Sequence, residues 1–132
     1  MRRRPIRTIQ IATVVITTVV LGCDSTPAEV TGPGELQALL ISPNGAEGAA
    51  VIELVGEGIG AVTAFRGSGR VFAERVGSTV RVVVVLDQPG EIRFRVAVDD
   101  VSDPPTGAVL DIADGSNEMR QSLAGYSVEF AR

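Results

Sequence analysis

Short stretches rich in β-branched and aliphatic residues recur from residue 36 to the end of the chain, and turn-forming residues separate them. Such a pattern predicts an all-β domain of the sandwich or barrel type. The expected strands are Leu36–Ser42, Ala50–Val55, Ala61–Phe65, Val71–Val76, Thr79–Leu86, Glu91–Val98, Ala108–Ala113 and Tyr126–Ala131. We therefore predict an antiparallel β-sandwich of about eight strands.

The apolar residues are distributed differently in two of these strands. Glu91–Val98 alternates strictly, with Phe94 on its apolar face, which predicts a half-buried strand and a core position for Phe94. Thr79–Leu86 carries aliphatic residues at consecutive positions, which predicts a central strand covered on both faces. Asp87–Gly90 lies between them and predicts a turn, so we expect the two strands to pair as a hairpin. Asn117–Ala124 is the one segment in which we expect a helical turn.

The first 22 residues follow another pattern. Four arginines fall within the first seven residues, and the uncharged run Ile9–Leu21 follows them. This run of 13 residues is shorter than the ~20 that a membrane-spanning helix needs. Basic residues, an apolar run and then the small residue Gly22 predict a cleaved secretory signal over residues 1–22.

The segment Val20-Leu21-Gly22-Cys23 resembles the lipobox of bacterial lipoprotein precursors. The resemblance implies that Cys23 receives a diacylglyceryl group on sulfur, that the signal is cut before it, and that the protein is exported to the bacterial cell envelope. Each buried CH₂ contributes ~0.8 kcal/mol, so two or three acyl chains would hold the protein firmly in a membrane. Asp24 resembles an inner-membrane retention signal whose rule varies between bacterial groups, so inner and outer membrane both stay open. The alternative is an accidental cysteine after an ordinary signal.

Asp24–Gly34 is rich in Gly, Pro and polar residues and has no apolar period, which predicts a flexible tether. The expected organisation is a signal peptide at 1–22, a lipidated N-terminus and tether at 23–34, and a β-sandwich at 35–132. Because Cys23 is the only cysteine, the sandwich has neither disulfides nor cysteine-based metal sites.

The net charge and the types of charged residue exclude several classes of ligand and reaction. Cleavage before Cys23 would remove four of the 12 basic residues and none of the 16 acidic ones, which leaves 8 − 16 = −8. A surface of this sign repels phosphate backbones, so nucleic acid is not an expected partner. The chain contains neither histidine nor lysine, which excludes histidine-dependent catalysis, serine triads and lysine Schiff bases.

Three short segments carry residues that could bind a ligand. Gly56–Ala61 has the spacing of a dinucleotide-binding glycine fingerprint, but a strand follows it where a helix is required, so we interpret it as a tight turn. Asp99, Asp100 and Asp103 are calcium candidates, and the alternative is a solvated turn before two prolines. The oxygen-rich stretch Asp111–Glu118 lacks the spacing of a calcium-binding loop and is equally natural as a turn.

Gly90–Val96, which follows a valine-rich strand, is similar to a late segment of cohesin-like β-sandwich domains. This resemblance implies a sandwich of the jelly-roll or cohesin-like type that binds protein or carbohydrate and does not catalyse a reaction. We therefore expect a lipid-anchored binding or structural module, not an enzyme, that needs no cofactor and contacts the membrane through Cys23 and an unidentified protein or glycan through its sandwich. Arg93 and Arg95 on the polar face are expected to form either a contact patch or cross-strand ion pairs. A carbohydrate-binding module with Tyr126 as its exposed aromatic and a carboxylate-based hydrolase are the alternatives.

Overall fold

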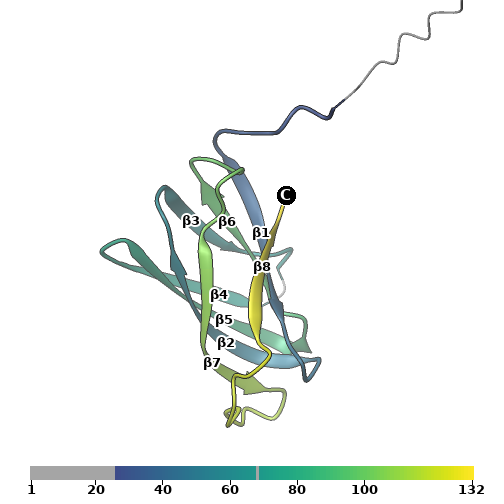
Figure 1. Ribbon diagram of the computed structural model, residues 1–132. Helices are drawn as coiled ribbons and strands as arrows, with labels where there is room; N and C mark the ends of the chain where they lie inside the picture. Colours follow the sequence, from purple (N-terminus) through teal and green to yellow (C-terminus); the bar gives the residue numbers. More distant parts are fainter. Residues whose placement is uncertain (1–25, 68) are drawn as a thin grey trace, which may run out of the picture.

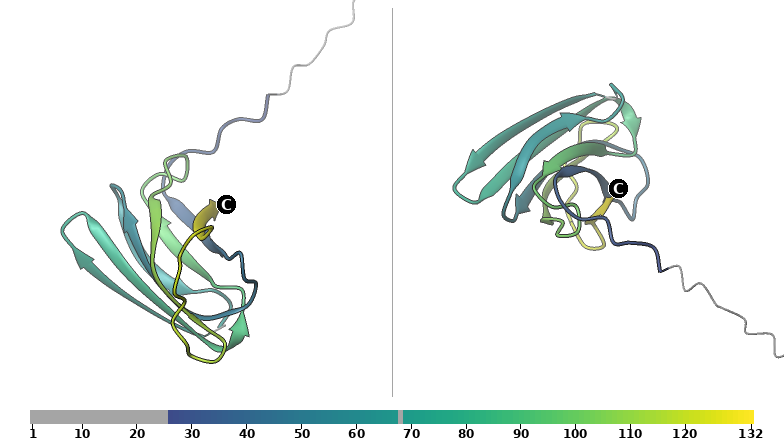
Figure 2. Two further views of the ribbon diagram at one scale, coloured as in Figure 1. Left: turned by 60° about the horizontal axis from the view of Figure 1, so that its bottom comes forward. Right: turned by 90° about the horizontal axis from the view of Figure 1, so that it is seen from above.

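The computed structural model describes residues 26–67 and 69–132 and confirms the antiparallel β-sandwich (Figure 1). The signal peptide and Cys23 lie outside the described residues. The strands are β1 (Gly34–Ile41), β2 (Glu47–Val55), β3 (Ile59–Ala64), β4 (Arg70–Val76), β5 (Thr79–Gly90), β6 (Arg93–Val98), β7 (Thr106–Asp114) and β8 (Ser127–Ala131). They form two four-stranded sheets in the orders β3-β6-β1-β8 and β4-β5-β2-β7, which stack as two layers (Figure 2). Within the described part of the chain, no helix is long and apolar enough to cross a bilayer.

The core lies between the two sheets and is built by the alternation that the sequence shows. In β6, every second residue from Phe94 to Val98 is buried and the residues between them are half-buried. Phe94 is 0% exposed, as predicted, and is the largest fully buried side chain among the described residues. The other sheet contributes mainly Ile52, Leu54, Val80, Val82, Val84 and Ile112. Because only one aromatic residue is fully buried, close packing of aliphatic side chains supplies most of the apolar burial.

The prediction that Thr79–Leu86 and Glu91–Val98 pair as a hairpin is wrong. β5 continues through the expected turn to Gly90, and it pairs with β2 and β4, whereas β6 pairs with β1 and β3 in the other sheet. The segment after Gly90 therefore crosses from one sheet to the other. In a sandwich this crossing lets the apolar faces of successive strands bury against each other across the core.

The prediction that β5 is covered on both faces is also wrong. β5 is an interior strand of its sheet, and Val82 and Val84 are buried. Val83 is only half-buried and Val85 is 42% exposed, because the described strands form two sheets and no third layer covers the outer face of this one. The valine-rich sequence thus places aliphatic side chains in solvent.

The helical turn expected at Asn117–Ala124 is absent, and this segment folds back along β7 as a loop. Oδ1 of Asp114 accepts hydrogen bonds from the backbone N–H groups of Ser116 and Glu118, at 2.8 and 3.1 Å. Asn117 adopts a left-handed conformation with φ of 62°, and an isolated bridge joins Met119 to β7. These local bonds satisfy the amide groups that would otherwise begin a helix.

The sandwich begins before β1. The N–H of Gly32 donates to Oδ1 of Asp100 at 3.0 Å, and the N–H of Val101 donates to the carbonyl of Gly32 at 2.9 Å. Gly34 then pairs with Val98 at the end of β6. The last residues of the expected tether are thereby fixed to the folded domain.

Candidate functional site

Glu47 lies at the start of β2. Among the described residues, it is the charged residue whose side chain is buried, with 1% exposure. It lies at a β-bulge, where the ladders to both neighbouring strands shift register between Glu47 and Ala49. Gly48 occupies the bulge, and a Cβ there would lie 2.5 Å from the carbonyl oxygen of Asp114. The bulge therefore depends on glycine, and it turns the Glu47 side chain inward.

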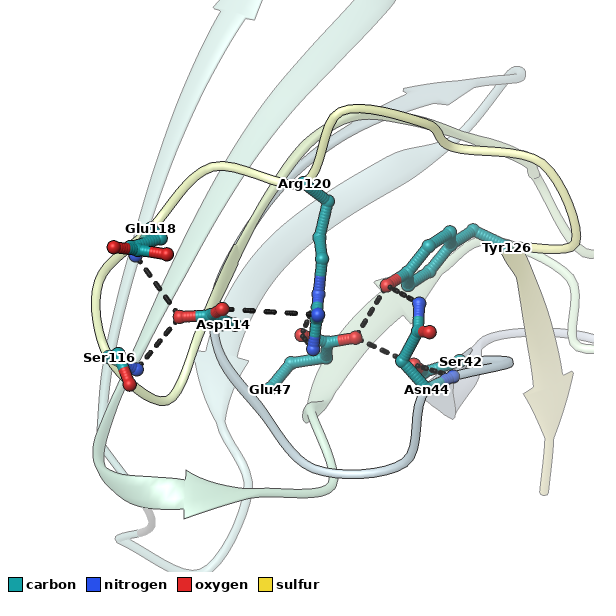
Figure 3. A network of polar contacts seen from close by, with 8 residues as sticks. All are labelled: Ser42, Asn44, Glu47, Asp114, Ser116, Glu118, Arg120 and Tyr126. Atoms are coloured by element: carbon teal, nitrogen blue, oxygen red, sulfur yellow. Dashed lines mark hydrogen bonds and ion pairs between the residues drawn. The ribbon is translucent and has the colours of Figure 1, made fainter.

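Three side chains hold the Glu47 carboxylate (Figure 3). Oε1 accepts from the hydroxyls of Ser42 at 2.7 Å and Tyr126 at 2.5 Å. Oε2 accepts a hydrogen bond from Nε of Arg120 at 3.1 Å and forms an ion pair with Nη2 of the same side chain, also at 3.1 Å. Nδ2 of Asn44 in turn donates to the Tyr126 hydroxyl at 2.8 Å. The network joins the turn after β1 to the long loop between β7 and β8.

The carboxylate is held in its ionised form. Burial by itself raises the pKa of Glu47, but the hydrogen bonds from Tyr126, Ser42 and Arg120, together with the Arg120 charge, outweigh burial and hold that pKa below its usual value. The hydrogen bond to Glu47 likewise raises the pKa of Arg120. Asp114 lies 3.9 Å from Nη1 of Arg120, and its bonds to the N–H groups of Glu118 and Ser116 lower the pKa of that carboxyl.

This geometry favours a structural role for the network. A hydrolase needs one carboxyl whose pKa is raised so that it can donate a proton near neutral pH, whereas the pKa values of Glu47 and Asp114 move the other way. Both oxygens of Glu47 are already occupied by protein donors. Tyr126, the aromatic of the sugar-binding alternative, has its hydroxyl bound to Glu47 and packs against the core.

The predicted calcium candidates close the turn after β6. Oδ1 of Asp100 accepts from the N–H and hydroxyl of Ser102, at 2.9 and 2.7 Å, as well as from Gly32. These bonds, those from Ser102 first, lower the pKa of Asp100. Asp99 and Asp103 are exposed. Across residues 26–67 and 69–132, no three acidic side chains come together in a way that could hold a metal ion.

A second group of charged residues lies on the outer face of the sheet β3-β6-β1-β8. The guanidinium carbons of Arg66, Arg93 and Arg95 lie 5.4, 5.7 and 5.6 Å from the ring centroid of Phe65. We call these four residues the arginine cluster. Phe65 and Arg66 directly follow β3, and the two other arginines project from β6. Each distance is within the range of a cation–π contact, so the ring orients all three cations.

Cross-strand ion pairing, one of the two expectations for Arg93 and Arg95, does not account for the cluster. The register places Arg95 opposite Thr63 and Gln37 and places Arg93 opposite Leu39, and none of these neighbours is charged. Among the described residues, Glu91 is the acid that pairs with the cluster, through Arg93. Three cations therefore share one ring in a chain with an excess of acidic residues.

Sequence reasoning located part of each group. Arg93 and Arg95 follow from the alternation of their strand, but the participation of Phe65 depends on the pairing of β3 with β6, which no local pattern shows. Glu47 was missed because its partners Arg120 and Tyr126 are 73 and 79 residues away in sequence. Comparisons of the chain with family models, curated proteins and solved structures find no match.

Proposed function

We propose that this chain is an exported protein, anchored in a membrane of the cell envelope through lipid on Cys23, whose β-sandwich binds an acidic polysaccharide through the arginine cluster. The observation that supports binding is the set of three guanidinium groups around Phe65, two of which, those of Arg93 and Arg95, have uncharged cross-strand neighbours. The resemblance of Val20–Cys23 to a lipobox supports the anchor.

The cluster has the chemistry to bind carboxylate, sulfate or phosphate groups. A guanidinium group that stacks on a ring keeps its N–H edge available, and this edge matches two oxygens of an anion. In Arg93 this edge is bound to Glu91, so Arg66 and Arg95 are the groups that would bind the ligand. Because the ring already orients the cations, less side-chain entropy is lost when a ligand binds. The acidic remainder of the domain repels anions elsewhere and confines them to the cluster.

A sugar chain fits this surface better than a small anion does. The cluster lies on the outer face of a sheet, so a polymer can extend across it. Thr63 and Gln37 flank Arg95 in the ladder, and their hydroxyl and amide groups can hydrogen-bond sugar hydroxyls. The arginines would then bind the acidic groups of the polymer, and the two polar neighbours its neutral groups.

Binding is tested by calorimetry on the full chain in detergent, with polygalacturonate as the ligand and neutral dextran of similar length as the control. Arg95→Gln should lower the affinity about 10-fold or more, because a hydrogen bond to a charged group contributes about 1.5–3 kcal/mol. Arg81→Gln is the matched control, since Arg81 is an exposed arginine on the other sheet, 3.8 Å from Glu53. Equal losses for the two variants, or equal binding of dextran and polygalacturonate, would contradict the proposal.

The anchor has a separate test. In its bacterial host, Cys23→Ser should prevent lipid attachment and cleavage before residue 23, so that protein of mature size no longer accumulates in the membrane fraction. The measurement is membrane fractionation followed by mass determination. A Cys23→Ser protein of mature size that still requires detergent for extraction would show that the assignment of the anchor is wrong.

A further inference from the structure

The edge strand β4 has one backbone edge with no paired strand, and most of its side chains are exposed, although Arg75 donates a hydrogen bond to the carbonyl of Ile59 in β3. It pairs with β5 alone and forms the end of the sheet β4-β5-β2-β7 (Figures 1 and 2). Every residue from Phe72 to Val76 is exposed, and Phe72 itself is 58% exposed. An open edge of this kind is a template on which another strand can pair.

The hydrogen-bond pattern of the β4–β5 hairpin determines which backbone groups of β4 face the free edge. The turn between β4 and β5 has two residues, because Val76 is the register partner of Thr79, and Gly77 has the positive φ that such turns require. The closing pair of a two-residue hairpin is hydrogen-bonded, and hydrogen-bonded pairs then recur at every second residue. The residues whose backbone groups face the free edge are therefore Val71, Ala73 and Arg75.

The same alternation places Arg70, Phe72 and Glu74 side by side on the outer face, with Phe72 opposite Val83. Two copies of β4 can pair as antiparallel strands about a two-fold axis if their free backbone groups meet. An axis at Phe72 satisfies this condition, and it sets Arg70 of each copy opposite Glu74 of the other, on either side of a Phe72–Phe72 pair. An axis at Ala73 also satisfies it, but places Phe72 opposite Glu74 and forms no pair of opposite charges.

We infer that two copies of this chain associate edge to edge along β4, with the two-fold axis at Phe72. Among the registers in which the free backbone groups meet, this one makes β4 self-complementary, because two Arg70–Glu74 pairs and one aromatic pair form together. The outer-face row of Phe72, Val83 and Val51 becomes continuous across the two molecules. The interface is isologous, as two-fold interfaces of identical chains are. This interface involves the sheet that does not carry the arginine cluster, so it does not depend on the proposed function.

Charge reversal tests the register. The full chain in detergent should be dimeric by sedimentation velocity. Glu74→Arg and Arg70→Glu should each weaken the dimer about tenfold, because each places two pairs of like charges opposite one another. The double variant Arg70→Glu/Glu74→Arg restores the opposite charges and should restore the dimer. Glu129→Arg, an exposed charge reversal on β8, should have no effect.

Cross-linking gives an independent measurement. Phe72→Cys should form a disulfide-linked dimer in membranes, because facing residues in such a pair lie about 4.5 Å apart at Cα. Val76→Cys, on the same strand and face and 65% exposed, should not, because the register separates the two copies of this position by about 27 Å. Wild type controls for cross-linking through Cys23.

The results that would overturn the inference are specific. A wild-type chain that stays monomeric at all concentrations would show that the charges on β4 only protect an exposed edge. Equal cross-linking of Phe72→Cys and Val76→Cys would refute the register. A dimer that neither single charge reversal weakens would place the interface elsewhere.

Discussion

Glu47→Gln is the substitution that most directly tests the role assigned to the buried network. Glutamine keeps the shape of the side chain but removes its charge and one of its two acceptor oxygens. In the wild-type protein both oxygens are used, one by the hydroxyls of Ser42 and Tyr126 and the other by Arg120. In the variant, the amide oxygen can remain with Arg120, and the amide nitrogen must then face the two hydroxyls.

The expected loss follows from the kind of bond that is changed. A hydrogen bond to a charged group contributes about 1.5–3 kcal/mol, whereas a neutral one contributes about 1 kcal/mol. The variant weakens several such bonds but keeps the packing, so we expect the free energy of unfolding at pH 7 to fall by about 2–4 kcal/mol. Urea unfolding measures this loss of stability. Tyr126, the only tyrosine, is a fluorescence probe within the network.

The pH dependence provides a second test. Because the pKa of Glu47 is lower in the folded state than its ordinary value of 4.5, the stability from its ionisation is fully present above that value. This stability is lost as the pH falls through the folded pKa. The difference between wild type and Glu47→Gln should therefore be largest above about pH 5 and shrink in acid.

Glu53→Gln is the matched control for this prediction. Its side chain is 32% exposed and lies 3.8 Å from Arg81, so its loss should stay below about 1 kcal/mol. If Glu47→Gln costs no more than this control at pH 7, the network does not stabilise the fold. A loss for Glu47→Gln that is the same at pH 7 and in acid would instead show that the ionised carboxylate is not the group responsible.

Two further predictions concern the core and the start of the domain. Phe94→Ala should lower the free energy of unfolding by about 3–5 kcal/mol, because it removes a side chain that is 0% exposed; a loss below about 1 kcal/mol in urea unfolding would contradict its place in the core. Asp100→Ala should weaken the attachment of Gly32 to the turn after β6, since it removes the acceptor of the Gly32 N–H and leaves the bond from the Val101 N–H; limited proteolysis should then cut near Gly32 faster than in wild type. Unchanged cleavage would show that the sandwich holds this segment by other contacts.

The strands could be predicted from the sequence because alternation is a local property, whereas the assignment of strands to sheets is not. Asp87–Gly90 has the residues of a turn, yet β5 extends through it and Gly90 pairs with Glu47. The valines of β5 indicate a strand, but they do not reveal whether a second layer covers its outer face. The helix prediction for Asn117–Ala124 failed because the Asp114 side chain binds two of the amide groups that would start it.

The two proposed surfaces lie on different sheets, and this separation has a consequence that can be measured. Antiparallel pairing along β4 about an axis normal to the sheet keeps corresponding faces of the two copies on the same side, so both arginine clusters point the same way. A long acidic polymer can then contact both clusters, and the second contact is strengthened by its high effective concentration. Glu74→Arg should therefore weaken binding of long polygalacturonate and leave binding of short oligogalacturonides unchanged, whereas Arg95→Gln should weaken both. If Glu74→Arg leaves the affinity for the long polymer intact while it dissociates the dimer, each cluster binds its ligand alone and the dimer has another role.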